Sequence, residues 1–486
     1  MDKSAREKYQ PVIGLEIHAQ LLTESKIYTS DSAAYGGAPN THVGVISLAH
    51  PGTLPKLNKR VVEQAVKMGL ACHSEISRTQ IFDRKNYFYP DLPKGYQLTQ
   101  DRTPICVGGH VTVSTKDESA IQIKLNRIHI EEDAGKSIHL DGEPDTLIDL
   151  NRAGVPLIEI VTEPVIRSSE EAGAMLSEIR KIVRYLQICD GNMEEGSLRC
   201  DANISVMRKG ATQLGKKVEV KNMNSIRNVQ RAIDYEIERQ ISELEKGNTP
   251  LSETRTFDAT TGVTSSMRTK EELNDYRYFP DPDLSPLHIS ADWLDQIKSS
   301  MPPLPEELFE KFVHDYNLPV YDARVLTETK EVAEYFMDVC NLTSNYKAAS
   351  NWIMGPIKSQ MNENGKAIVE LGLMPSQLSE IIELVDQGKI SFANASQQIL
   401  PAMMAQTDKS AMQLATELNL IQESDQGNLI KVIDSVLDSF PDKVKEYQKG
   451  KKGLISMFMG EVMKQSKGKA DPKKTNVLLM KKLSEL

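Results

Sequence analysis

Three short stretches decide the fold, VIGLEIHAQL (12–21), VPLIEIVTE (155–163) and SLRCDANISV (197–206), because apolar and polar residues alternate strictly in each of them. Side chains on a β-strand point to opposite faces with period two, so each stretch predicts a strand with one apolar and one polar face. The polar faces carry Glu16, His18 and Gln20; Glu159 and Glu163; and Arg199, Asp201, Asn203 and Ser205. Carboxylates, an imidazole, a guanidinium and amides recur on these faces, which is typical of the lining of a site.

The rest of the chain predicts an α+β multidomain protein. A length of 486 residues exceeds one hydrophobic core. We expect a catalytic domain over 1–295, mainly an antiparallel β-sheet cradle, because this part is rich in short β-patterned runs and Gly/Pro turns. Two helices are predicted within it, at 168–188 and 225–247. An all-α helical domain is expected over 296–405 and an all-α tail over 406–486, because the apolar period changes there to 3.6. The helices predicted in these two domains cover 305–316, 325–340, 344–363, 376–386, 391–403, 408–418, 425–439, 441–449, 452–466 and 470–485.

Charge is distributed unevenly along the chain. The formal net charge is −10, yet residues 441–486 contain twelve lysines against five acidic residues. Glycines lie among these lysines at 449–453 and 467–469, where they would let ammonium groups approach phosphates closely. A solvated helix face with glycine caps explains the pattern equally well. The candidate nucleic-acid contacts are Lys449, Lys451, Lys452, Lys464, Lys467 and Lys469.

No targeting or redox signal is visible in the sequence. The first residues lack the apolar core of a signal peptide, and no run reaches the ~18 apolar residues of a membrane span. The five cysteines form no Cys-x-x-Cys pair. We therefore expect a cytoplasmic protein with buried thiols.

A cation site is predicted from acidic residues around the first strand. Glu16 and His18 share a strand face, and the run NRIHIEEDAGKS (126–137) ends in three adjacent acids that repel one another unless a cation or a basic group lies between them. With Glu159, the set Glu16, His18, Glu132 and Glu159 offers three carboxylates and one imidazole. Oxygen ligands favour Mg²⁺ or Mn²⁺, while the histidine leaves zinc open.

Two loops carry basic and aromatic residues suited to a nucleotide. FDRKNYFYPDLPKGYQ (82–97) and MRTKEELNDYRYFPDPDL (267–284) combine cations and amides with aromatic rings, which can grip phosphate and stack a base. An aromatic-pinned loop that covers the core is the alternative. No phosphate loop is present, because position 130, five residues before Gly135-Lys136-Ser137, is Ile.

The runs VIGLEIHAQL, FDRKNYFYPDLPKGYQ, HIEEDAGKS, DLNRAGVPLIEIVTEP, MEEGSLRCDANISV, VKNMNSIRNVQRAI and DYRYFPDPDL, in this order, closely resemble the B subunit of the bacterial aspartyl/glutamyl-tRNA amidotransferase. The resemblance covers essentially the whole chain. It implies a cradle-shaped catalytic domain, a helical domain and a YqeY-like tail that binds tRNA.

The resemblance also implies the activity. Family members work in a heterotrimer with an amidase A subunit and a small C subunit, as a ligase that forms carbon–nitrogen bonds with glutamine as amide donor. With ATP and Mg²⁺ the B subunit phosphorylates the side-chain carboxylate of Glu-tRNA(Gln) or Asp-tRNA(Asn), and ammonia from the A subunit then displaces phosphate.

The site residues follow from the resemblance and from residue chemistry together. By family analogy the metal residues are His18, Glu132 and Glu159, with Glu16 beside them. The catalytic set adds Arg199 and Asp201, where Asp201 would hold a second cation or position Arg199. The expected ATP contacts are Lys85, Asn86, Tyr87, Asn203, Lys221 and Arg277.

Two other classes use the same residues differently. A metal-dependent hydrolase would use the carboxylates with a metal-bound water and without ATP. A tRNA-binding scaffold would need the polar strands only for structure.

Overall fold

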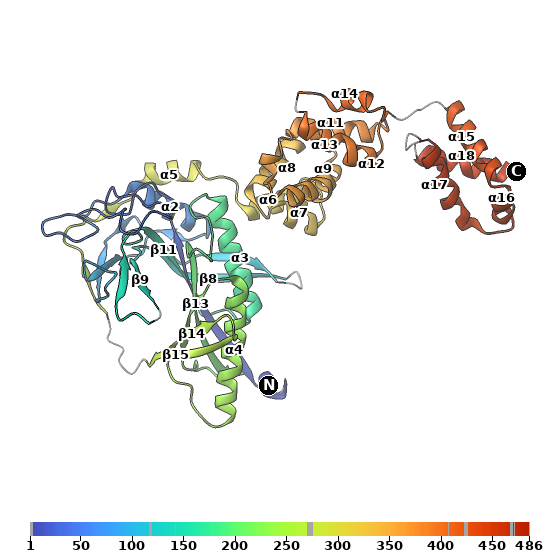
Figure 1. Ribbon diagram of the computed structural model, residues 1–486. Helices are drawn as coiled ribbons and strands as arrows, with labels where there is room; N and C mark the ends of the chain where they lie inside the picture. The colour runs from blue at the N-terminus through green and yellow to red at the C-terminus, as the bar shows by residue number, and fades with distance from the viewer. Residues whose placement is uncertain are drawn as a thin grey trace. The chain divides into compact units, whose positions relative to one another are not determined.

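A ten-stranded sheet forms the centre of the N-terminal part of the chain (Figure 1). The computed structural model describes residues 3–115, 119–140, 142–269, 276–406, 408–421, 426–466, 470 and 472–485. The chain divides into two compact units, residues 1–305 and 306–486. The strand order in the main sheet is β15-β14-β13-β12-β1-β11-β8-β6-β2, with β7 paired to β8. Among the described strand pairs of this sheet, β13–β14 is parallel and the others are antiparallel. The expected α+β class with a mainly antiparallel sheet is therefore confirmed.

The described strands are β1 Tyr9–Gln20, β2 Glu75–Ile76, β3 Thr79–Gln80, β4 Asp83–Asn86, β5 Tyr96–Thr99, β6 Cys106–Val107, β7 His110–Ser114, β8 Ala120–Glu132, β9 Lys136–His139, β10 Thr146–Asp149, β11 Pro156–Thr162, β12 Leu198–Arg208, β13 Val218–Met223, β14 Glu253–Asp258, β15 Val263–Thr269, β16 Arg277–Pro280 and β17 Leu287–His288. The three predicted strands are thus β1, β11 and β12, and they are neighbours in the order β12-β1-β11.

The apolar face of the sheet packs against helices. Leu15, Ile17 and Ala19 are at most 1% exposed and belong to a core shared with α2 Lys59–Ala71, α3 Ser169–Tyr185 and α4 Ile226–Glu245. The hydroxyls of Ser168 and Ser225 cap α3 and α4 and accept from backbone amides of their first turns. Helices cover this face, so the polar face of the sheet stays available for a site.

Three helices of the N-terminal unit differ from expectation, and the first of them is the short α1 Lys3–Glu7. The sequence predicted only α3 and α4 there, but α2 also forms, capped by Asn58, whose side-chain oxygen accepts from the backbone N–H of Arg60 at 2.9 Å. Its apolar residues follow helical spacing from Val61 to Met68, so the sequence pattern does indicate this helix. A further helix, α5 Ala291–Ser299, spans the expected boundary between the catalytic domain and the helical domain at residues 295 and 296.

Unit 2 is helical in its described residues. The predicted helix over 344–363 is a continuous run of α9, a π-helical turn at Ile353–Ile357 that contains Pro356, and α10. A separate core, with Phe458 and Val462 at its centre, joins the helices after residue 426. The helices are α6 Pro305–His314, which begins at the last residue of unit 1, α7 Val320–Leu326, α8 Lys330–Cys340, α9 Tyr346–Trp352, α10 Lys358–Asn364, α11 Pro375–Asp386, α12 Phe392–Asn394, α13 Leu400–Ala405, α14 Ala411–Glu417, α15 Gln426–Ser439, α16 Pro441–Gln448, α17 Ile455–Gln465 and α18 Pro472–Glu485, and the short α1 Lys3–Glu7 precedes β1.

Two further observations concern the chain as a whole. No helix among the described residues is long and apolar enough to cross a membrane. All five cysteines are buried and free, as expected.

Candidate functional site

The polar residues of the central strands form a row across the sheet. The register places His18 opposite Glu159 on β11 and opposite Arg199 on β12, and it places Glu159 opposite His129 on β8. Residues opposite one another in a sheet share a face. Segments more than a hundred residues apart therefore contribute side chains to one polar surface.

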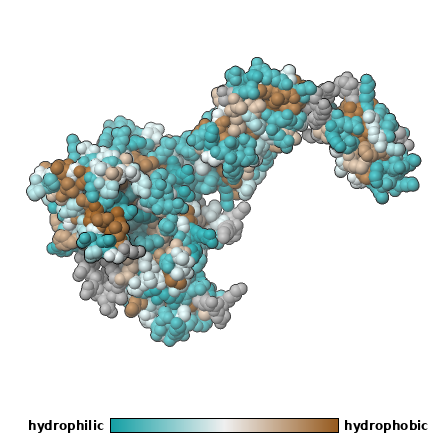
Figure 2. Space-filling view, viewed as in Figure 1, coloured by the Kyte–Doolittle hydropathy of each residue, from teal (hydrophilic) through white to brown (hydrophobic). Residues whose placement is uncertain are grey.

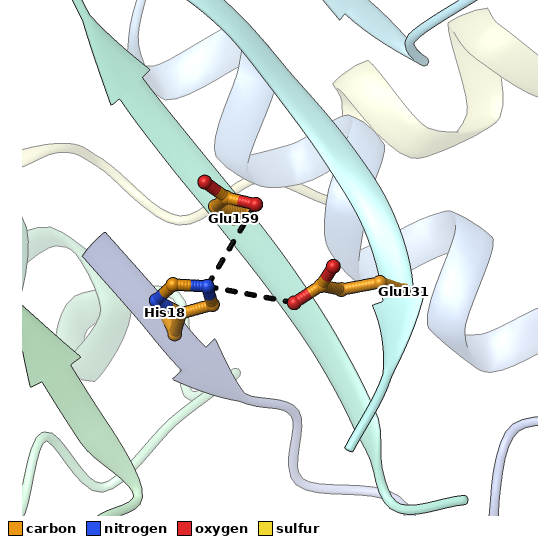
Figure 3. A group of neighbouring side chains, drawn as sticks. All are labelled: His18, Glu131 and Glu159. Carbon is orange, nitrogen blue, oxygen red and sulfur yellow. Dashed lines mark ion pairs between the residues drawn. The ribbon is translucent and has the colours of Figure 1, made fainter. Parts of the chain in front are cut away.

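His18, Glu131 and Glu159 form the best candidate metal site (Figure 3). The Nε2 atom of His18 lies 3.5 Å from Oε1 of Glu131 and 3.7 Å from Oε2 of Glu159. His129 completes the cluster, with its Nε2 atom 3.1 Å from Oε2 of Glu159. Two carboxylates and an imidazole that converge in this way suit a divalent cation such as Mg²⁺ or Mn²⁺.

The electrostatics of this cluster favour the ionised form of Glu159. Burial alone would raise the pKa of Glu159, but hydrogen bonding and charge from His129, with further contributions from His18 and Lys85, outweigh it and hold the pKa well below its usual range. Burial likewise opposes protonation of His129, yet its hydrogen bonds to Glu131 and Glu159 raise its pKa to about 9. The Nδ1 atom of His129 is buried without a hydrogen-bond partner among the described residues.

Glu16 belongs to a second group of carboxylates. Its carboxylate lies with those of Asp201 and Glu219, and the side-chain amide of Asn203 donates to it at 2.8 Å. Lys221 neutralises this group, with its Nζ atom 2.5 Å from Oδ2 of Asp201 and 3.1 Å from Oε1 of Glu219. Burial and the charge of Glu159 raise the pKa of Glu16. The structure thus groups Glu16 with Asp201 and Glu219, groups His18 with Glu131 and Glu159, and pairs Asp201 with Lys221.

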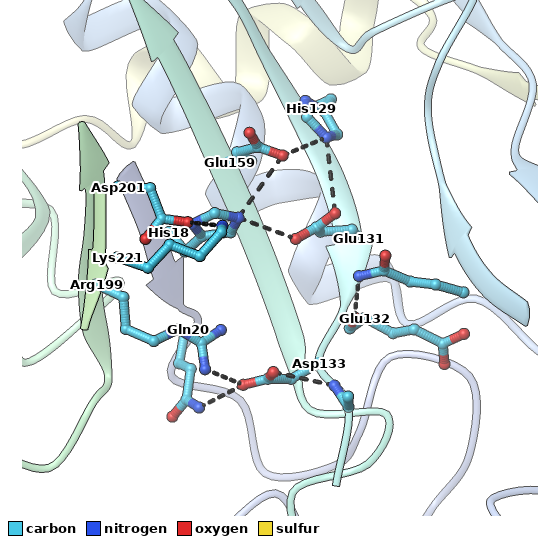
Figure 4. Close-up of polar contacts among 12 residues, drawn as sticks. His18, Gln20, His129, Glu131, Glu132, Asp133, Glu159, Arg199, Asp201 and Lys221 are labelled. Atoms are coloured by element: carbon cyan, nitrogen blue, oxygen red, sulfur yellow. Dashed lines mark hydrogen bonds and ion pairs between the residues drawn. The ribbon is translucent and has the colours of Figure 1, made fainter. Parts of the chain in front are cut away.

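Asp133 is the partner of Arg199 (Figure 4). Its Oδ2 atom lies 3.0 Å from Nη1 of Arg199 and accepts a 2.8 Å hydrogen bond from Nε2 of Gln20. Burial opposes ionisation of Asp133, but Arg199 and Arg152 outweigh it and lower its pKa. Arg199 is therefore held by Asp133, whereas the sequence had assigned Asp201 as its possible positioning partner.

Glu132 does not join the metal cluster, contrary to expectation. It is adjacent to Glu131 on β8, so its side chain points to the opposite face of the strand, away from His18 and Glu159 (Figure 4). There it pairs with Lys94 and accepts from the backbone N–H of Leu98 at 2.9 Å. Glu131 replaces it in the cluster.

The expected nucleotide contacts on the two loops come together in a small sheet. Its strand order is β16-β4-β5, and Arg277 pairs with Asn86, whose side-chain amide donates to the Arg277 carbonyl at 2.9 Å. The Nζ atom of Lys85 lies 4.8 Å from the ring centre of Tyr276 and 5.6 Å from that of Tyr87. The charge of Lys85 is also among the influences that lower the pKa of Glu159.

The tail lysines lie mainly at the ends of α16 and α17. Lys449, Lys451, Lys452 and Lys464 are exposed. Lys451 pairs with Glu446 at 3.0 Å, and Lys452 stacks over Tyr447 at 4.3 Å. Lys467 and Lys469 lie outside the described residues.

Several site residues were not singled out from the sequence as ligands or partners. Glu131 and His129 lie on the same face of β8, and the alternation in the run IHIEED predicts that they share a face. Which of the two faces of β8 meets His18 depends on the register of β8 against β11, which the sequence pattern does not give. Glu219, Lys94 and the pairing role of Asp133 become visible only in three dimensions. Glu163, expected beside Glu159, follows the end of β11 and accepts from Asn126 at 2.8 Å.

Comparison with known proteins defines the class first. Residues 11–295, which include the polar face of the sheet, match the family model described as the GatB/GatE catalytic domain, and residues 334–483 match the model described as the GatB domain. The first match spans more than half of the chain.

The chain belongs to the family of aspartyl/glutamyl-tRNA(Asn/Gln) amidotransferase B subunits. It is 48% identical to the B subunit of Thermodesulfovibrio yellowstonii over 478 residues, which cover 98% of this chain and 100% of that protein. It is also 48% identical to the B subunit of Geotalea daltonii, over 98% of this chain and 99% of the relative, and 46% identical to that of Salinibacter ruber, over 99% and 98%. The resemblance found in the sequence is therefore confirmed.

Proposed function

We propose that this chain is the B subunit of a tRNA-dependent amidotransferase that converts Glu-tRNA(Gln), Asp-tRNA(Asn) or both to the amidated forms. The similarity to relatives of that name over their full lengths supports the activity. The cluster of His18, Glu131 and Glu159, with Arg199 on the same polar face of the sheet, is the observation that supports this site.

The reaction needs activation of a carboxylate. A side-chain carboxylate oxygen of the aminoacyl-tRNA attacks the γ-phosphorus of ATP, the bond from that phosphorus to the β–γ bridging oxygen breaks, and ADP leaves. Ammonia then attacks the acyl carbon, inorganic phosphate leaves with the former carboxylate oxygen, and the nitrogen loses a proton to give the amide. Both reactants of the first step are anionic, so the site must supply positive charge in a preorganised geometry.

The donor set of His18, Glu131 and Glu159 fits Mg²⁺, which when bound would neutralise charge on the triphosphate. Lys85, held near aromatic rings, is assigned to a phosphate, and Tyr87 to the base or ribose. Arg199 and Lys221 each already contact a carboxylate that orients them, Asp133 and Asp201. Such held cations lose little freedom when an anion binds. Asn86, Asn203 and Arg277 are assigned as neighbouring contacts.

Partners follow from the proposed activity. An amidase A subunit would supply ammonia and a small C subunit would complete the assembly.

Exposed apolar side chains gather on the loop between β1 and α2, and Figure 2 shows a hydrophobic patch where this dark-blue loop lies in Figure 1. They are Tyr35, Val45, Leu48 and Leu54, each at least 40% exposed. A patch of this kind is typical of a protein interface, and we assign it to the amidase partner. Leu54→Lys should weaken assembly by at least about tenfold, measured by analytical ultracentrifugation.

The remaining assignments concern the domains. We assign the catalytic domain to 1–295, the helical domain to 296–405 and a tRNA-binding YqeY-like tail to 406–486, and the cytoplasm as the compartment in which aminoacyl-tRNA is made.

The test is ATP-coupled transamidation by the reconstituted complex with misacylated tRNA. His18→Asn and Glu159→Gln should each reduce ADP formation at least about a hundredfold, while glutamine hydrolysis by the partner continues. Near-normal transamidation by both variants, when they are folded, would indicate that this chain acts as a tRNA-binding scaffold without a catalytic role at this site. Turnover of a phosphate or amide substrate without ATP would instead favour a hydrolase.

A further inference from the structure

Strand β13 contains a β-bulge beside the polar face of the main sheet. The pairing of β13 with β12 shifts by one residue between Cys200 and Ala202 of β12. Between these positions β12 supplies one residue, Asp201, whereas β13 supplies two, Lys221 and Asn222. An extra residue of this kind redirects the side chains around it, and bulges are frequent next to active sites.

The extra residue decides which face of the sheet Lys221 occupies. Val220 and Met223 are both at most 5% exposed and belong to the hydrophobic core. Alternate residues of a regular strand share a face, so a regular strand that buries Met223 would also turn Lys221 toward the core. The bulge at Asn222 removes this conflict, because Met223 enters the core while Lys221 stays with Asp201 on the polar face.

The backbone of Asn222 has an unusual conformation. Its φ is 65°, in the left-handed region, and the other described non-glycine residues with positive φ lie outside strands and helices. Glycine and asparagine adopt this conformation readily, whereas β-branched residues do so rarely. The Asn222 side chain is exposed, and its amide donates to Oγ1 of Thr256 on β14 at 2.9 Å. A substitution here therefore acts through the backbone and not through packing in the core.

The bulge places the Lys221 ammonium between two carboxylates. Its Nζ atom lies 2.5 Å from Oδ2 of Asp201 and 3.1 Å from Oε1 of Glu219, and Figure 4 shows the contact with Asp201. We infer that Asn222 is a positioning residue, whose left-handed backbone conformation holds Lys221 on the polar face for contact with a phosphate. This inference rests on the proposed function, which assigns Lys221 to the nucleotide.

The first test is calorimetric titration of the reconstituted complex with Mg²⁺ and the ATP analogue adenylyl imidodiphosphate. Asn222→Val should weaken binding at least about fivefold, because a β-branched residue disfavours the left-handed conformation. Asn222→Gly loses the bond to Thr256 but keeps the backbone conformation, so its affinity should stay within about twofold of the wild type. Asn222→Ala should lie between them, which keeps the comparison informative if the valine variant does not fold.

Two further variants separate positioning from general strain. Lys221→Met should weaken binding, and adding Asn222→Val to it should cause no additional loss, because both changes act through the same ammonium group. Asn317, exposed between α6 and α7, has a φ of 54° and serves as the matched control. Asn317→Val introduces the same kind of backbone strain in unit 2 and should leave nucleotide affinity unchanged.

A second readout does not depend on the nucleotide. Acylation of Lys221, followed by mass spectrometry, should be slow in the wild type and in Asn222→Gly, because the Nζ atom lies between two carboxylates, and faster in Asn222→Val. Wild-type affinity and labelling in Asn222→Val, or equal losses in the valine and glycine variants, would overturn the inference. Faster labelling in Asn222→Val together with normal nucleotide binding by Lys221→Met would support the positioning of Lys221 and refute its proposed contact with the nucleotide.

Discussion

The carboxylates of Glu131 and Glu132 point to opposite faces of β8, although the two residues are adjacent in the chain. Glu131 lies 3.5 Å from His18, whereas Glu132 accepts from the backbone N–H of Leu98 and pairs with Lys94. Strand alternation requires this separation. Only one of the two residues can therefore serve as a ligand together with His18 and Glu159.

This separation predicts different cation affinities for two isosteric variants. Glu131→Gln should weaken Mn²⁺ binding by at least about tenfold because it removes an anionic ligand. Glu132→Gln should leave Mn²⁺ binding within about threefold, since its amide oxygen can still accept from Lys94 and Leu98. Electron paramagnetic resonance of free Mn²⁺ measures both. Equal loss in the two variants would contradict the assignment of the cluster.

Much of this arrangement follows from local sequence. Alternation in 12–21 identifies the polar face of β1, and the serines at 168 and 225 mark the starts of α3 and α4. The choice between Glu131 and Glu132 depends instead on how β8 is aligned with β11, and a one-residue slip would exchange their faces. That register is set by packing between distant segments, so single-strand patterns do not contain it. The pairing of Arg199 with Asp133 depends on the same long-range geometry.

Lys26 predicts a pH dependence of stability. Its side chain is fully buried and its Nζ atom donates to the carbonyl oxygens of His42 at 2.7 Å and Leu150 at 3.3 Å. Burial lowers its pKa to about 8 from the usual 10.5, although Asp31, Asp149 and Glu132 oppose this shift. Between these two values the unfolded chain binds more protons, so the contribution of Lys26 to stability rises with pH.

The comparison variant is Lys26→Met, which keeps the apolar stem without a titrating group. The free energy of unfolding of the wild type relative to this variant should increase by up to about 3 kcal/mol between pH 8 and pH 10.5. Below pH 8 the difference should be constant, because Lys26 is then protonated in both states. Urea unfolding across this range measures it, and a pH-independent difference would contradict the lowered pKa.

Glu236 predicts a large structural effect away from the candidate site. It is fully buried on α4, accepts from Nη2 of Arg239 at 2.6 Å, and lies 3.6 Å from Nε of Arg255 on β14. Glu236→Ala leaves the partly buried guanidinium groups of Arg239 and Arg255 with Glu253 as their remaining carboxylate partner. This loss of a fully buried partner should lower the free energy of unfolding by about 3 kcal/mol. Glu243→Ala, a change at a half-exposed position of the same helix that removes a pair with Lys246, should lower the free energy of unfolding much less. Similar decreases in the free energy of unfolding for both variants would show that burial of the carboxylate does not determine the size of the effect.

The tail lysines predict a change in the salt dependence of tRNA binding. Lys449, Lys452 and Lys464 are exposed and make no ion pair with another described residue, whereas Lys451 is already paired with Glu446 at 3.0 Å. A lysine that releases a counterion from a phosphate contributes about 0.7–0.9 to the slope of log affinity against log salt. The triple change of these three residues to Gln should therefore reduce the slope by about two. Lys366→Gln, an exposed charge before the tail, should leave it unchanged. Lys451 must first break its ion pair with Glu446, so Lys451→Gln should reduce the slope by less than Lys449→Gln does. Equal slopes for the wild type and all of these variants would show that the tRNA contacts lie elsewhere.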